Sequence, residues 1–247
     1  IEGKKAFIKN ISGSDKFIAE YLRNEDLKQI QNSINAILLQ TSILDRICAR
    51  LCEMVTEQTN AQQTLEWLHD ANFFIDPLDS QHIWYRYHPM FRDLLQNRLK
   101  KTQPELISDL HRRAGKWYKS EAFWDEAINH LFKAGEFQLA ADLITRVADD
   151  LLLEGYADTY VRWMDTLPKE VREENPMIMV HYIFLLFIKG TPPSEISSLL
   201  EKAEKIDREG SVIGEIMLLR SYVGLDKIQN HQLVNKALEL IPSSQLF

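Results

Sequence analysis

The sequence has few cysteines and glycines and no long apolar run, and each absence excludes a class of protein. Its two cysteines, Cys48 and Cys52, lie four positions apart on one expected helix, a spacing that does not suit a disulfide. We therefore expect buried thiols in a reducing compartment. No apolar segment approaches the roughly 20 residues that a membrane-spanning helix needs, and no secretory signal pattern occurs. These features predict a cytoplasmic protein without a membrane partner.

The usual catalytic and cofactor-binding motifs are also missing. The nine glycines include no G-x-x-x-x-G-K-[ST] phosphate loop, so the chain cannot bind a nucleotide through such a loop of its own. The seven histidines lack the H-E-x-x-H or Cys-x-x-Cys spacings that would converge on a metal, and no G-x-S-x-G elbow is present. We therefore expect no catalytic residue, metal or cofactor in this segment, and we do not expect it to be an enzyme.

Apolar spacing predicts helices followed by a β-hairpin in the first part of the chain. Two helices are expected between Lys16 and Leu39, one from Ile43 to Val55, and one from Ala61 to Ala71. Short aromatic and β-branched runs at 73–78 and 83–87 flank a turn and predict two strands. Pro89 then occupies a favoured first position of another helix, which carries an apolar stripe. This order is the layout of a winged helix.

From residue 104 onward only helical spacing remains, which predicts a string of short helices. The segment Leu199–Ala203 matches Leu233–Ala237 at an offset of 34 residues. Leu131, Lys133 and Ala134 match Leu200, Lys202 and Ala203 at an offset of 69, close to twice that. About 34 residues is the period of TPR repeats. The expected fold is therefore mainly α: a winged helix followed by a TPR-like, right-handed helical-repeat array. Both ends of the chain, Ile1 and Phe247, look cut from a longer protein.

Charge argues against a nucleic-acid partner for this segment. The chain has 29 Lys and Arg against 36 Asp and Glu, a net charge of −7, which is the wrong sign for binding phosphate backbones. The expected third helix of the winged helix, 61–71, contains Glu66 and Asp70 and no Lys or Arg, whereas a helix that reads the major groove needs Arg, Lys, Asn or Gln at base edges. We therefore expect no direct nucleic-acid contact from it.

His88 is the first candidate site residue. It stands directly before Pro89, where free backbone N–H groups and the helix dipole favour an anion, and where an imidazole can add a hydrogen bond or a charge. The alternative is a capping histidine that packs against Trp84 and Tyr87 of the hairpin.

Aromatic residues of the array form the second candidate, a ligand or partner surface on the concave side of the repeats. The alternative is that they are the core between helices, because aromatic side chains dominate packing. The residues are Trp117, Tyr118, Trp124, Tyr160 and Trp163.

Four segments carry a resemblance to a known family. They are Leu38 to Arg46 (LLQTSILDR), Trp84 to Leu95 (WYRYHPMFRDLL), His111 to Tyr118 (HRRAGKWY), and the run from Glu126 to Ile144. Together they resemble the middle of MalT-like, LuxR-type ATP-dependent transcriptional regulators (LAL proteins) of the STAND class. The resemblance runs from about residue 12 to 170 and fades toward the end of the chain.

The resemblance implies a domain order and a function. Residues 1–40 would be the tail of an upstream ATPase helical subdomain, 41–103 the winged-helix domain, and 104–247 a truncated TPR-like sensor region. The winged helix would hold an ADP-bound resting state, with His88 contacting the ADP phosphates, and the array would sense an inducer, either a small molecule or a protein. The other partners of this segment would be the ATPase and DNA-binding domains of the same protein, and ATP or ADP would be the cofactor of the intact protein.

Two other readings stay open at this point. The chain could be a free-standing helical-repeat adaptor that binds only proteins, or an independent winged-helix DNA binder. A phosphate loop in upstream sequence would favour the regulator, and salt-sensitive binding to duplex DNA would favour the third reading.

Overall fold

The computed structural model describes residues 28–71, 73–223 and 227–241. The chain divides into two compact units, Ile1–Ala114 (unit 1) and Gly115–Phe247 (unit 2). The elements of unit 1 are α3 (Lys28–Thr41), α4 (Ala49–Thr56), α5 (Ala61–Asp70), β1 (Ile75–Pro77), β2 (Tyr85–Tyr87), α6 (Pro89–Thr102), the short 3-10 helix η3 (Pro104–Leu106) and the first half of α7 (Ile107–Ser120). The first of the two helices expected between Lys16 and Leu39 lies outside the described residues.

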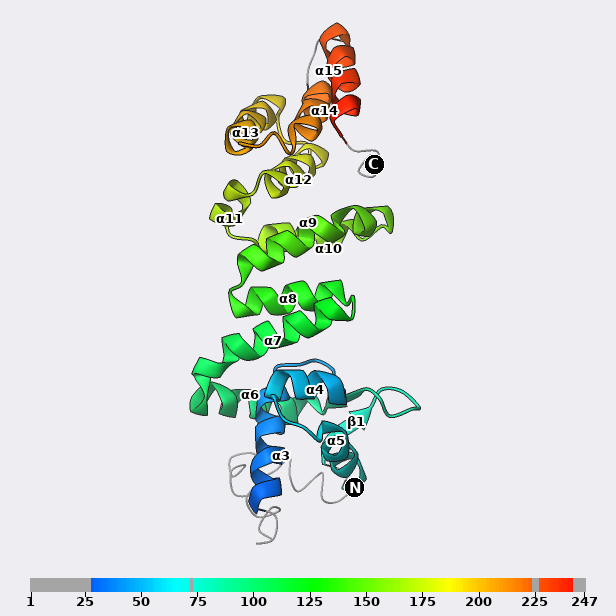
Figure 1. Cartoon of the computed structure of the whole chain (residues 1–247), viewed down its shortest axis with the longest axis vertical. Coiled ribbons are helices and arrows are strands. Elements are labelled where there is room, and N and C mark those ends of the chain that lie inside the picture. The colour runs from blue at the N-terminus through cyan, green and yellow to red at the C-terminus, as the bar shows by residue number, and fades with distance from the viewer. Residues whose placement is uncertain (1–27, 72, 224–226, 242–247) are drawn as a thin grey trace. The chain divides into compact units, whose positions relative to one another are not determined.

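Unit 2 is built from helices alone in its described part (Figure 1). After the second half of α7 they are α8 (Trp124–Ala134), α9 (Phe137–Leu153), α10 (Ala157–Thr166), α11 (Lys169–Glu174), α12 (Pro176–Ile188), α13 (Pro193–Ile206), α14 (Ile213–Val223) and α15 (Lys227–Leu240). Short connections join consecutive helices from α8 to α14, and Gly135 ends α8 at φ 76°, a left-handed conformation that favours glycine.

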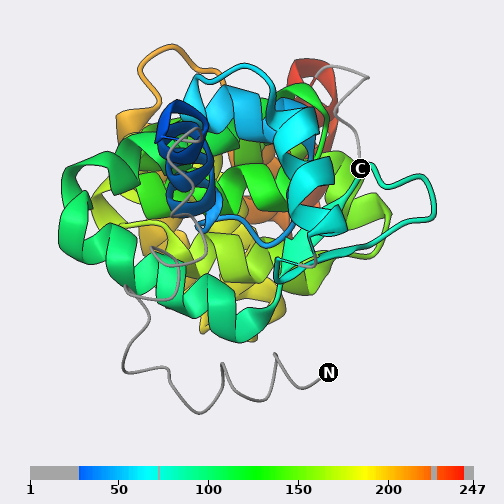
Figure 2. The same ribbon diagram turned by 90° about the horizontal axis from the view of Figure 1, so that it is seen from below.

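The hairpin of unit 1 is a two-stranded antiparallel sheet. Its register pairs Ile75 with Tyr87 and Pro77 with Tyr85. Tyr85 and Tyr87 point inward and are buried, while Arg86 between them is exposed, as the alternation of a strand requires. The loop between the strands projects away from the helices of unit 1 in both views (Figures 1 and 2). It is the wing of the winged helix.

The helix expected from Ile43 to Val55 begins later than expected, at Ala49. Ile47 instead forms an isolated antiparallel bridge with Tyr85, in which each backbone N–H donates to the other residue's carbonyl oxygen over 2.8 Å. The apolar side chain at position 47 fits a helical spacing equally well, so the sequence pattern did not reveal that this backbone extends the sheet. The bridge fixes the hairpin to the segment before α4.

The core of unit 1 gathers one apolar face from each helix around the buried side of the hairpin. Fully or almost fully buried members include Ile37 on α3, Leu51 on α4, Leu65 on α5, Tyr85 on β2 and Phe91 on α6. Phe91 also lies edge-on to Phe73, with ring centroids 5.6 Å apart. This core sets the orientation of the N-terminal end of α6, where the candidate site lies.

In unit 2 consecutive helices pack against one another. The helix pairs α8 with α9, α9 with α10, α12 with α13, and α14 with α15 are in contact. At Gly214 on α14, an added Cβ would lie 2.6 Å from Cγ1 and 3.3 Å from the backbone N of Ile241, just after α15. The absence of a side chain at Gly214 therefore allows close packing there. The matching segments found in the sequence lie on α8, α13 and α15.

The expected fold class, mainly helical with a winged helix and a helical array, is confirmed. The two-unit division falls at residue 114, whereas the expected domain boundaries were residues 40 and 103; those boundaries remain predictions. Within the part of the chain that the structure describes, no helix combines the length and apolar character needed to cross a membrane.

Candidate functional site

Two of the segments that carry the family resemblance contact each other in unit 1. The end of α3 and the loop after it contact the hairpin and α6 through three polar contacts. These are Thr41 Oγ1 to the Tyr87 hydroxyl (2.7 Å), Asp45 Oδ1 to Arg92 Nη1 (2.5 Å), and the Ser42 carbonyl oxygen to Gln96 Nε2 (2.8 Å). Burial raises the pKa of the Tyr87 hydroxyl, which therefore stays protonated and available for hydrogen bonding. These contacts hold the start of α6 in place.

His88 lies between β2 and α6, at the N-cap position of α6. Its backbone is fixed on both sides: its N–H donates to the Phe74 carbonyl oxygen over 2.8 Å, and its own carbonyl oxygen accepts from Phe91 N and Arg92 N. Its side chain makes no capping hydrogen bond and is exposed. In this conformation the His88 side chain therefore does not cap α6, because it is exposed to solvent and forms no hydrogen bond with the first turn of the helix.

The surroundings of His88 suit an anion. The first residues of α6 present the positive end of the helix dipole, and Pro89 has no N–H of its own, so the backbone N–H of Met90 is the nearest donor that no α6 residue can satisfy. An imidazole beside a helix N-terminus can donate a hydrogen bond to a phosphate or carboxylate oxygen. The arrangement can therefore bind an anionic group, although the role of His88 stays a prediction.

The aromatic residues expected to form a ligand surface on the array are mostly buried. Trp117, Tyr118, Tyr160 and Trp163 are between 0% and 6% exposed, whereas Trp124 is 37% exposed. In this structure the four buried rings are part of the core, which was the alternative reading of the sequence. A ligand surface formed by these residues stays a prediction, and Trp124 is its one exposed member.

Asp125, the residue after Trp124, accepts hydrogen bonds from three side chains, and no pattern in the sequence indicated this role. Its Oδ1 accepts hydrogen bonds from the indole N–H of Trp163 (3.0 Å), from Arg162 Nη2 (2.6 Å) and from Asn129 Nδ2 (2.9 Å). Trp163 is fully buried, so the carboxylate satisfies an indole N–H that has no access to water. Asp125 therefore supports the packing between α8 and α10.

The surface of α5, the third helix of the described winged helix, is not basic. Its exposed residues are Gln62, Gln63, Glu66, Trp67 and Asp70. The side-chain amide of Gln62 donates a hydrogen bond to the carboxylate of Glu66 over 2.6 Å. This bond uses an amide N–H that could otherwise donate to the edge of a DNA base. The expectation that this unit makes no direct nucleic-acid contact stays a prediction, and the geometry of α5 agrees with it.

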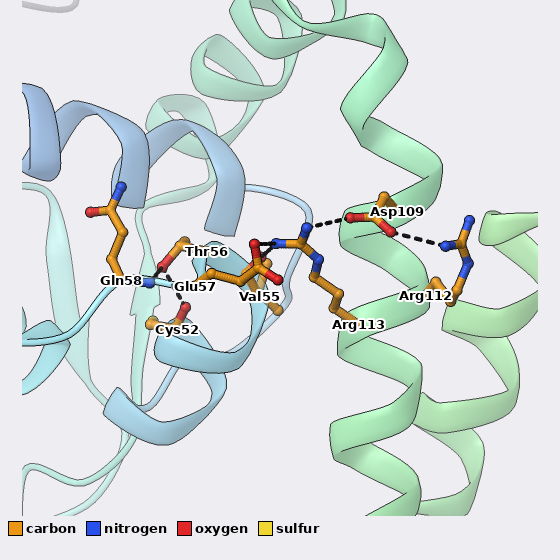
Figure 3. Close-up of polar contacts among 8 residues, drawn as sticks. All are labelled: Cys52, Val55, Thr56, Glu57, Gln58, Asp109, Arg112 and Arg113. Atoms are coloured by element: carbon orange, nitrogen blue, oxygen red, sulfur yellow. Dashed lines mark hydrogen bonds and ion pairs between the residues drawn. The ribbon is translucent and has the colours of Figure 1, made fainter.

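A connection from α7 to the winged helix is the feature that the sequence analysis missed. Arg113 on α7 donates to the Val55 carbonyl oxygen at the end of α4 over 3.0 Å and pairs with Glu57 and Asp109 (Figure 3). Asp109 also pairs with Arg112 over 3.0 Å. The residues His111 to Tyr118 had been noticed only as part of the resemblance, and no spacing rule could show that Arg113 reaches α4. We call these contacts the Arg113 junction.

The backbone at the end of α4 turns into a left-handed conformation at Glu57, one of the residues of the Arg113 junction. Glu57 has φ 57°, in the left-handed region that usually contains glycine, and its N–H donates to the Glu53 carbonyl oxygen. Thr56 Oγ1 donates to the Cys52 carbonyl oxygen over 2.8 Å and accepts from Gln58 N (Figure 3). A glutamate at a position that favours glycine keeps a carboxylate beside Arg113, at some cost in backbone strain.

Neither the cysteines nor the histidines form a metal site in the described residues. No group of three His, Cys, Asp or Glu side chains there is arranged to hold an ion. Cys48 and Cys52 are buried thiols that form no disulfide, and burial raises the pKa of Cys52, so this thiol stays protonated. Their buried position fits the structural role expected for them.

Comparison with known proteins gives consistent matches. The family model of the MalT winged helix domain matches residues 23–107. The chain is 26% identical over 236 residues to HTH-type transcriptional regulator MalT of Cronobacter sakazakii, which is 93% of this chain and 26% of that protein. It is 25% identical over 236 residues to MalT of Klebsiella pneumoniae, again 93% of this chain and 26% of that protein. It is 27% identical over 161 residues to serine/threonine-protein kinase PknK of Mycobacterium tuberculosis, 65% of this chain and 14% of that protein.

The hairpin, the position of His88 and the helices that follow define a winged-helix unit joined to a helical array. The matches agree with this architecture: residues 23–107 match the MalT winged helix domain, and the chain is similar to MalT regulators over 93% of its length. It spans about a quarter of the length of the MalT relatives it matches. The expected family resemblance is thereby confirmed.

Proposed function

We propose that this chain is the regulatory segment of a signal-responsive, ATP-dependent transcriptional activator. The winged helix holds an ADP-bound resting state, and the helical array senses an inducer or partner. The observation that carries the proposal is the match of residues 23–107 to the MalT winged helix domain, combined with an exposed His88 ring at the start of α6. An ATPase module and a DNA-binding domain of the same protein are the partners that this function requires.

The residues around His88 fit a nucleotide phosphate. The ring is exposed and makes no capping hydrogen bond, and its backbone is fixed by the bond to Phe74, so the side chain can meet a phosphate without rearrangement of α6. ADP would supply two anionic phosphates, which the helix dipole and the imidazole attract. His88 would bind and orient this group and would not take part in any bond cleavage.

The Arg113 junction supports the regulatory part of the proposal. Arg113 lies beyond the matched winged helix domain and donates a hydrogen bond to the Val55 carbonyl oxygen in the last turn of α4. A helix that both follows the winged helix and bonds to it provides a physical link through which occupancy of the array can change the winged-helix equilibrium. In this scheme, an inducer acts by binding the open state more tightly than the resting state.

The proposal is tested by calorimetric titration of ADP into two proteins, this chain alone and the protein extended by the sequence encoded upstream of Ile1. We expect binding only to the longer protein. In that protein His88→Ala should weaken ADP binding roughly tenfold, because it removes a charge-assisted or neutral hydrogen bond to phosphate. The matched control is His231→Ala, which removes an exposed histidine on α15 and should leave ADP affinity unchanged.

Two results would contradict the proposal. Unchanged ADP affinity in the His88→Ala variant would remove His88 from the nucleotide site. Absence of ADP binding by the longer protein would favour the free-standing adaptor, and the search would then turn to protein partners of the array.

A further inference from the structure

Unit 2 contains a cavity that none of the expected site residues lines. It lies between α11, α12 and α13 and has a volume of ≈ 600 Å³, which is within the range of small-molecule sites. Its lining combines an apolar part with a charged part. The apolar and aromatic members are Met179, Tyr182, Leu186 and Leu199.

The charged part of the cavity is more basic than the rest of the chain. Four basic and three acidic side chains line it, a net charge of +1 in a chain whose net charge is −7. The basic residues are Lys169 and Arg172 from α11 and Lys202 and Lys205 from α13. A local excess of positive charge in an acidic protein raises the local concentration of small anions.

Three of these cations already surround one carboxylate. Glu173 Oε1 lies 2.5 Å from Lys202 Nζ and 3.8 Å from Lys169 Nζ. The hydrogen bond from Lys202, with the charges of Lys202, Lys169 and Arg172, holds the pKa of Glu173 below its usual range. Glu173 therefore marks a place where the geometry of α11 and α13 stabilises a carboxylate.

Two further basic groups complete the surroundings. Lys205, one turn beyond Lys202 on α13, is exposed and forms no ion pair with any residue of the described chain. The guanidinium carbon of Arg172 lies 4.6 Å from the centre of the Tyr182 ring, and Arg172 Nη1 donates to the Met164 carbonyl oxygen over 2.8 Å. The stacked pair offers a flat, partly apolar surface beside the cationic groups.

We propose that the cavity between α11, α12 and α13 binds a small organic anion, in which a carboxylate or phosphate group on an apolar or aromatic body meets Lys205 and Lys202 while the body packs on Tyr182, Leu186 and Leu199. The remaining carboxylates, Glu195 and Glu201, also line the cavity and accept hydrogen bonds from donors on the ligand. This inference rests on the proposed sensor function of the array and names the chemistry of its signal.

The test uses this chain and three aromatic probes: phenyl phosphate, phenylacetate and the neutral benzyl alcohol. Binding is followed by amide chemical shifts in NMR titrations. We expect phenyl phosphate or phenylacetate, or both, to shift amides of α11 to α13, and benzyl alcohol to bind at least about tenfold more weakly, because it lacks the charge. The two anionic probes distinguish a phosphate ligand from a carboxylate ligand.

Variants identify the group responsible. Lys205→Glu should weaken binding of the anionic probe at least about tenfold, because it removes a charge-assisted contact and adds a repulsive charge. The matched control is Lys133→Glu on α8, an exposed lysine that does not line the cavity and that gives the same change in net charge. Circular dichroism checks that both variants keep their helical content.

Equal binding of all three probes, absence of binding by both anions, or equal weakening by Lys205→Glu and Lys133→Glu would overturn the inference. Selective loss of anion binding with Lys205→Glu would support it. The test shares no residue or ligand with the ADP titration of His88, so failure of the anion site and failure of the proposed nucleotide switch are distinguishable.

Discussion

Arg113 Nη1 lies 3.1 Å from Glu57 Oε2 and 3.0 Å from the Val55 carbonyl oxygen, so one guanidinium serves both an ion pair and the unpaired end of α4. The two contacts differ in strength. The Glu57 side chain is 71% exposed, and such an ion pair is weakened by solvent, whereas the carbonyl bond satisfies a helix end. The junction therefore depends on the carbonyl bond more than on the ion pair.

This difference predicts the effect of two variants on stability. Arg113→Met should lower the free energy of unfolding by about 1–3 kcal/mol, because it removes the bond to the Val55 carbonyl oxygen and both ion pairs. Glu57→Gln should lower it by no more than about 1 kcal/mol, since the pair is largely exposed. Urea denaturation measures both values. Equal losses in the two variants would show that the ion pair dominates.

Asp125 provides a second pair of contrasting variants. Asp125→Ala should lower the free energy of unfolding by about 1–3 kcal/mol, because the buried indole N–H of Trp163 loses its acceptor. Asp125→Asn keeps an oxygen at this position and should cost clearly less. Denaturation followed by tryptophan fluorescence measures both variants. If the alanine and asparagine variants are equally stable, the bond to Trp163 contributes nothing.

His181 on α12 predicts a dependence of stability on pH. Burial lowers the pKa of its imidazole from 6.5 to about 4, and within the described residues its Nδ1 has no hydrogen-bond partner. The unfolded chain therefore binds the proton more tightly, so the stabilising contribution is complete above pH 6.5 and is lost as the pH falls from 6.5 toward 4. Between pH 6.5 and pH 4 the free energy of unfolding should fall by about 3 kcal/mol through this one group.

The measurement for His181 is the slope of the unfolding free energy between pH 4 and 6.5. His181→Leu should flatten this slope, whatever its effect on absolute stability. The control His231→Gln replaces an exposed histidine and accounts for the loss of a histidine as such. An unchanged slope in His181→Leu would show that another group titrates.

Asp79 predicts local order in the wing. Its carboxylate accepts hydrogen bonds from the backbone N–H groups of Gln81, Ile83 and Trp84, and those of Ile83 and Trp84 hold its pKa below the usual range. Because the pKa of Asp79 is lower in the folded chain, the ionised carboxylate stabilises the wing above the ordinary carboxyl pKa. This stabilisation is lost as the pH falls through the lowered pKa.

Asp79→Ala should therefore accelerate hydrogen exchange of the Gln81, Ile83 and Trp84 amides severalfold, with little effect on α3 to α6. The control is Asp76→Ala, which replaces an exposed carboxylate on β1. Amide exchange followed by NMR gives both results. If the two variants behave alike, the carboxylate of Asp79 does not order the wing.

The sequence predicted the parts of this structure that depend on local periodicity. Alternation at Tyr85, Arg86 and Tyr87 indicated a strand, Pro89 indicated the start of α6, and the position of His88 followed from both. Its exposure could not be predicted, because a cap residue can turn toward the helix or toward solvent.

Long-range contacts were not predictable from the same patterns. Arg113 lies on α7 and Glu57 directly follows α4, and nothing in the apolar spacing of either helix predicts that these two side chains meet. The same limit applies to the aromatic residues of the array, because the sequence does not show that Trp117 is buried and Trp124 is partly exposed. The cavity beside Tyr182 likewise depends on how three helices meet.

The bond between Asp125 and Trp163 has an optical consequence. Trp163 is the last tryptophan in the chain, so tryptophan fluorescence comes from the winged helix and from α7 to α10, and no tryptophan lies on α11 to α15. Tyr182→Trp would place an indole against Arg172 at the edge of the cavity. Emission from that position would then follow the occupancy of the cavity directly, above a background whose buried components, Trp117 and Trp163, are shielded from solvent quenchers.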